Sequence, residues 1–76
     1  MDSKQRNALI KQLLKNIDEA NFNFLTSGCE ENVTYWRGRL DGLDAAATIM
    51  GIDPSSILDA KTAAANRAAE AFGAHA

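Results

Sequence analysis

Apolar residues recur every three or four positions along most of the chain, which is the spacing of one face of an α-helix. A short polar stretch and, further on, a glycine followed closely by a proline interrupt this pattern. We therefore predict an all-α fold with one domain over residues 1–76. It is an antiparallel helical hairpin plus a third, alanine-rich helix, together a three-helix bundle. The predicted helices cover about residues 3–25, 28–50 and 54–72.

The two interruptions carry recognised signals for helix ends. Ser27 and Glu30 have the spacing of a capping box, which predicts that Ser27 caps the second helix. The alternative is that Gly28 closes the first helix, and both options give a short connection. Gly51 is predicted to end that helix, because glycine adopts the left-handed conformation found after many helices. Asp53 and Pro54 predict the start of the third helix, with a capping side chain followed by proline at the first helical position.

The first two helices each carry one apolar stripe, and the two stripes match in period, which predicts that they pack together as the core. The stripe on the first helix consists of Ile10, Leu13, Ile17, Ala20 and Phe24. The stripe on the second helix consists of Val33, Trp36, Leu40, Leu43, Ala47 and Met50. The apolar side of the third helix is mostly alanine, with larger residues only near its ends.

The second helix also has an apolar face on the side opposite Trp36 and Leu40. Two mid-helix glycines there each cost about 1 kcal/mol relative to alanine, which indicates that another backbone approaches closely. The missing side chains at the glycines leave a groove on this face. It could be filled by the third helix, by a second copy of the chain or by a target protein, and a further interpretation is that the glycines are placed there by chance. We predict a helix-packing or oligomer face made of Gly38, Gly42, Ala45, Ala46 and Ile49.

Aromatic residues gather around the first turn, and two arginines follow them. Aromatic and arginine side chains are the usual anchors of protein interfaces. Trp36 lies on a core stripe, and the two arginines could equally be solvated side chains. The predicted partner-binding residues are Phe22, Tyr35, Trp36, Arg37 and Arg39.

Composition excludes several other classes of protein. With Cys29 as the only cysteine and His75 as the only histidine, we expect no disulfide, no metal, no cofactor and no catalytic residues, so the chain is predicted not to be an enzyme. The net charge is −2, so the chain lacks the excess of basic residues that a general nucleic-acid binder carries. The polar N-terminal residues and the absence of a long apolar run predict a cytoplasmic protein without membrane contact.

The segment 46–60 resembles a helix-turn-helix unit: Ala47 precedes Gly51 by four residues, and Ile52 and Ile57 follow it. The resemblance implies DNA binding by the helix that follows Pro54. In that alternative the contacting residues would be Ser55, Ser56, Asp59, Lys61 and Thr62.

The segment 35–46 resembles the second helix of small helical-hairpin accessory proteins of bacteriophages, which share a loose aromatic-x-x-Gly-Arg-x-x-Gly-Leu pattern. This resemblance implies a protein that acts by stoichiometric binding, for example as an inhibitor of a host protein or defence system in the host cytoplasm. We predict a non-catalytic protein-binding module that partners another protein, itself in a homo-oligomer, or both. A DNA-binding protein and a structural assembly subunit are the alternatives.

Overall fold

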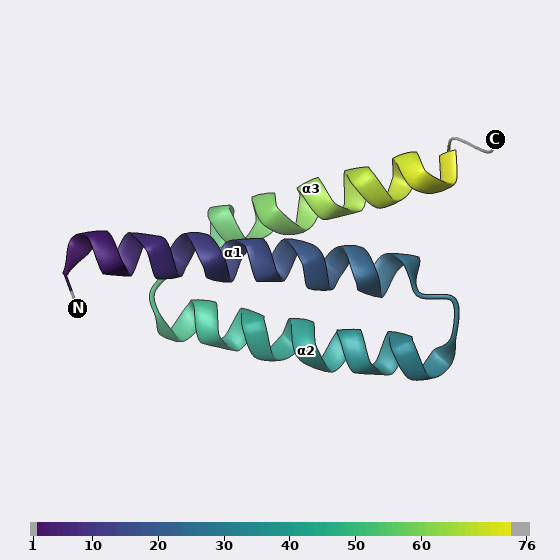
Figure 1. Ribbon diagram of the computed structural model, residues 1–76, viewed down its shortest axis with the longest axis horizontal. Coiled ribbons are helices and arrows are strands. Elements are labelled where there is room, and N and C mark those ends of the chain that lie inside the picture. The colour runs from purple at the N-terminus through teal and green to yellow at the C-terminus, as the bar shows by residue number, and fades with distance from the viewer. Residues whose placement is uncertain (1, 74–76) are drawn as a thin grey trace.

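A computed structural model describes residues 2–73 and shows three α-helices: α1 (Ser3–Thr26), α2 (Glu30–Ile49) and α3 (Pro54–Gly73) (Figure 1). The all-α class and the hairpin of α1 and α2 are confirmed, and each helix begins and ends within two residues of its predicted bounds. His75 lies outside the described residues.

The central helix of the fold is α1, which packs against both of the others, whereas α2 and α3 touch only over a short stretch. In Figure 1, α2 lies on one side of α1, and α3 starts behind α1 and diverges on the other side. The molecule is flat and elongated, with extents of 46 × 24 × 17 Å. The third helix therefore packs within its own chain, against α1.

The core forms where the predicted stripes meet. Ile17 and Ala20 of α1 contact Leu40 and Ala47 of α2, and all four are buried. Across α1 from this contact, the buried residues of α3 beyond Ile57 are alanines, whose small side chains leave little bulk between helices. They are Ala64 and Ala68.

The chain leaves α2 through a Schellman motif, as the glycine predicted. Gly51 has φ of +76°, and its amide donates to the carbonyl of Thr48 at 3.0 Å. The next amide, of Ile52, donates to the carbonyl of Ala47, also at 3.0 Å. This pair of hydrogen bonds turns Ile52 back into the core, where only 6% of it is exposed. The direction of the chain at this turn is therefore set by residues that are close in sequence.

The prediction that Ser27 caps α2 was wrong. Its hydroxyl donates to the carbonyl of Asn23 at 2.5 Å, so it serves the end of α1 instead. The N-cap of α2 is Cys29, and its side chain makes no capping hydrogen bond. At the other junction Asp53 behaves as predicted, because its carboxylate accepts from the amide of Ser55 at 3.1 Å.

Candidate protein-binding surface

The predicted packing face of α2 is open in the single chain. Gly38, Gly42 and Ala45 are exposed and Ile49 is 85% exposed, while Ala46 is half-buried. A methyl group placed on either glycine would meet no atom within 4 Å. From the sequence we expected another backbone to approach these glycines closely, and within residues 2–73 none does.

The reading in which the third helix fills the glycine groove was wrong. Helix α3 lies against α1 and makes few contacts with α2, among them the ion pair of Lys61 with Asp44. The physical reason is that α1 offers α3 a second contact surface, beyond the stripe that α2 covers. Within residues 2–73, α3 therefore leaves Gly38 and Gly42 uncovered.

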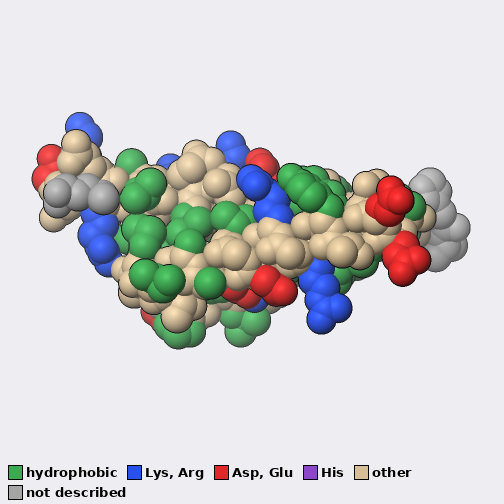
Figure 2. All heavy atoms as spheres, turned by 90° about the horizontal axis from the view of Figure 1, so that it is seen from below, with side chains coloured by type: hydrophobic (Ala, Val, Ile, Leu, Met, Phe, Trp, Pro, Cys, Tyr) green, Lys and Arg blue, Asp and Glu red, His purple; other side chains and the backbone are tan. Residues whose placement is uncertain are grey.

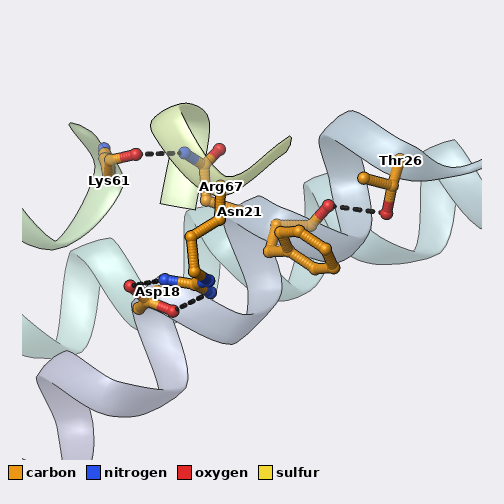
Figure 3. Close-up of polar contacts among 6 residues, drawn as sticks. Asp18, Asn21, Thr26, Lys61 and Arg67 are labelled. Atoms are coloured by element: carbon orange, nitrogen blue, oxygen red, sulfur yellow. Dashed lines mark hydrogen bonds and ion pairs between the residues drawn. The ribbon is translucent and has the colours of Figure 1, made fainter. Parts of the chain in front are cut away.

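Arg67 of α3, which sequence reasoning did not single out, makes polar contacts with α1 (Figure 3). Two guanidinium nitrogens of Arg67 donate to the two carboxylate oxygens of Asp18, at 2.8 and 2.5 Å. The guanidinium carbon lies 5.2 Å from the centre of the Phe22 ring, within the range of a cation–π contact. The hydrogen bonds that Arg67 donates to the carboxylate of Asp18 raise the pKa of Arg67 above its ordinary value, so the guanidinium stays charged. Next to Phe22 in the sequence, Asn21 donates to the carbonyl of Lys61 at 2.9 Å.

These contacts divide the predicted aromatic cluster. Phe22 faces α3, where Arg67 covers it. Tyr35 and Trp36 meet on α2 edge to face, with ring centres 5.0 Å apart. Trp36 is half-buried and packs against the core, as its stripe predicted, whereas Tyr35 is 59% exposed. Only Tyr35 among the three remains an exposed candidate anchor.

The two predicted arginine anchors are exposed and lie on opposite flanks of α2's outer side. Among residues 2–73 the ion pairs are those of Asp18 with Arg67 and of Asp44 with Lys61. Arg37 and Arg39 therefore have no carboxylate partner within that range, and the pairing of Arg37 with Asp41 that a four-residue spacing allows is not formed. Both guanidinium groups are available to another molecule.

Seen from the side of α2, the surface carries apolar side chains among backbone and uncharged polar side chains, with small groups of charged side chains between them (Figure 2). We use the name outer face of α2 for five of its residues that lie on the side of the helix away from Leu40 and Ala47. They are Tyr35, Gly38, Gly42, Ala45 and Ile49.

At the second turn the structure has the helix, glycine turn and helix that the DNA-binding alternative needs. Ser55, Asp59 and Thr62 are exposed on α3, and Ser56 is half-buried. Lys61, the one cation in that predicted set, is occupied by Asp44. The set therefore presents a free carboxylate but no free cation to a phosphate backbone.

The comparisons with known proteins add no family: no family model, curated protein or solved structure matches the chain. Within residues 2–73, no helix has the length and apolar character needed to cross a membrane. The same residues hold no group of three or more His, Cys, Asp or Glu side chains placed to share a metal ion.

Proposed function

We propose that the chain is a non-catalytic protein-binding module and that the outer face of α2 is its contact surface. The observation that carries this proposal is the exposure of Ile49 and Tyr35 on either side of two glycines whose surroundings are empty. An isoleucine that is 85% exposed gains nothing from the fold of its own chain. It would be buried by a partner that lies along α2.

The shape of the face favours a helical partner. Without side chains at Gly38 and Gly42, the backbone of α2 is open to close approach by another helix. Tyr35 and Arg39 stand one turn apart at the edge of this bare region, and both residue types are frequent anchors of interfaces. The binding mode is therefore packing of helix against helix, with apolar contacts at the centre and polar contacts around them.

The non-catalytic part of the proposal rests on the sequence, which contains none of the recognised catalytic motifs. The resemblance of segment 35–46 to bacteriophage hairpin proteins supports a finer form of the proposal. In that form the partner is a host protein in the bacterial cytoplasm, and stoichiometric binding inhibits it.

A comparison of two surface variants tests the proposal. Tagged wild-type protein, Ile49→Glu and Leu58→Glu are used to capture proteins from a bacterial lysate, and the captured amounts are measured by mass spectrometry. Ile49 and Leu58 are both exposed aliphatic residues, but Leu58 lies on α3. The proposal expects a protein that wild type and Leu58→Glu retain in near-equimolar amounts and Ile49→Glu loses. Identical capture by all three would contradict it.

A further inference from the structure

The outer face of α2 has the spacing of a coiled-coil seam. Its five residues lie three, four, three and four positions apart, which is the alternation of the a and d positions of a heptad. In heptad letters Tyr35, Gly42 and Ile49 are a positions, and the two residues between them are d positions. The core side of the same helix belongs to Leu40 and Ala47, which are both f positions in this register.

We propose that this face binds the same face of a second copy of the chain, in a parallel, two-fold symmetric dimer. The inference rests on the proposed function, because it names the partner of the same surface. It rests further on two properties of the face, its size profile and the charges that flank it.

The size profile is self-complementary. The large residues, Tyr35 and Ile49, stand at the two ends, and the residues between them are glycine or alanine. Two crossed helices are closest at their crossing point and separate toward their ends. A second copy would set small residues against small ones at the crossing and large residues against large ones where the helices separate. Among residues 2–73 no atom lies within 4 Å of a methyl group placed on either glycine, so the space at the crossing point is open.

The flanking charges select the orientation. Arg39 occupies the e position and Asp41 the g position, so they lie on opposite flanks of the seam, and both are exposed. A parallel pair sets each e flank against the partner's g flank, which places Arg39 beside a flank that carries Asp41. An antiparallel pair sets e against e and g against g, which brings like charges together on both flanks. Opposite charges therefore favour the parallel arrangement.

One residue opposes the dimer. Glu31 is exposed and continues the seam by one step beyond Tyr35, at a d position. A parallel dimer brings the two copies of Glu31 toward each other, which weakens it. The seam from Tyr35 to Ile49 is also short, about 21 Å at 1.5 Å per residue. We therefore expect a small, transient interface with a dissociation constant between about 10 µM and 1 mM.

Sedimentation equilibrium of the full chain at concentrations up to about 1 mM tests the dimer. We expect the mass of the wild type to rise toward that of two chains as the concentration increases. Ile49→Glu and Gly42→Leu should keep the mass of one chain, whereas Leu58→Glu should behave as wild type. Circular dichroism should show unchanged helix content for all three variants, because the altered positions are exposed or empty. A wild-type mass of one chain at every concentration would overturn the proposal, and so would a dimer that survives Ile49→Glu.

Two further measurements test the orientation. In a Cys29→Ser background, Ala45→Cys should form an intermolecular disulfide on oxidation, because a parallel pair brings equivalent d positions together. Ala69→Cys, an exposed position on α3, is the matched control and should not cross-link. Glu31→Gln should tighten the parallel dimer several-fold. Cross-linking at Gly42→Cys but not at Ala45→Cys, with no gain from Glu31→Gln, would indicate an antiparallel pair and overturn the parallel one.

The dimer and the proposed function can fail separately. A monomer that still captures another protein through Ile49 would overturn the dimer and leave the binding module intact. A monomer whose capture does not depend on Ile49 would overturn both.

Discussion

The replacement of Ile17 by alanine measures how far this small fold depends on its core. Ile17 is completely buried, and among residues 2–73 no fully buried side chain is larger. It sits at the centre of α1, among the residues that α2 and Ile57 bring against it. Truncation of a buried isoleucine to alanine costs about 2–5 kcal/mol, from the lost transfer free energy and the cavity left behind.

That loss is comparable to the whole stability of the chain. A domain of this size has a net stability of about 3–5 kcal/mol. A loss of about 3 kcal/mol would lower the melting temperature by on the order of 10–20 °C. It would also leave a measurable unfolded fraction at room temperature. Thermal and urea unfolding followed by circular dichroism at 222 nm would report both effects.

The matched control is Ile49→Ala, the same chemical change at a side chain that is 85% exposed. In dilute solution it should change stability by less than about 0.5 kcal/mol. Equal losses of stability in Ile17→Ala and Ile49→Ala would refute the packing described here, because both isoleucines would then have to be buried.

Three other predictions follow from the turns and the polar contacts. Gly51→Ala should destabilise the fold by about 1–2 kcal/mol in urea unfolding, because the φ of +76° at this position suits glycine. Gly42→Ala should instead stabilise the monomer by about 1 kcal/mol, because alanine favours a helix interior. A change of the same sign in both variants would contradict the left-handed turn at Gly51. Arg67→Met should lower the melting temperature and make it less sensitive to sodium chloride than in wild type, because the contacts with Asp18 and Phe22 are lost; an unchanged salt response would count against that pair. No electrophoretic shift of duplex DNA should occur at low salt, because Lys61 is paired with Asp44; a shift that weakens with added salt would restore the DNA-binding alternative.

The parts of the fold that the sequence predicted are those with local causes. The end of α2 depends on Gly51 and on the hydrogen bonds that the amides of Gly51 and Ile52 donate. The start of α3 depends on Asp53 and Pro54. The pairing of α1 with α2 follows from two matching stripes joined by a short turn, which leaves few other arrangements. The misassigned cap at Ser27 shows the limit of this reasoning. A hydroxyl at a short turn can serve either helix, and here both Thr26 and Ser27 donate backward into α1.

The position of α3 could not be predicted in the same way. Its contact with α1 includes the ion pair of Asp18 with Arg67, which are 49 residues apart in sequence and belong to no common motif. The sequence did contain one sign of it, since Phe22 stands on the otherwise polar side of the first helix. An aromatic residue in that position indicates a cover, and the cover is Arg67. The candidate site differs from its prediction for the same reason. Phe22 contacts α3 and is not part of the exposed aromatic cluster, and α3 does not cover the glycines of α2.

The two glycines of α2 therefore need an explanation that the chain alone does not contain. Together they cost about 2 kcal/mol relative to alanine, a large fraction of the stability of a domain this small. No contact within residues 2–73 depends on their missing side chains, since a methyl group on either would meet nothing. The double variant Gly38→Ala/Gly42→Ala separates the two remaining explanations. If a partner helix uses the bare backbone, the variant gains monomer stability and loses binding at the outer face of α2. If the glycines are there by chance, it gains the same stability and loses no binding, and the case for an assembling or partner-binding protein is then lost.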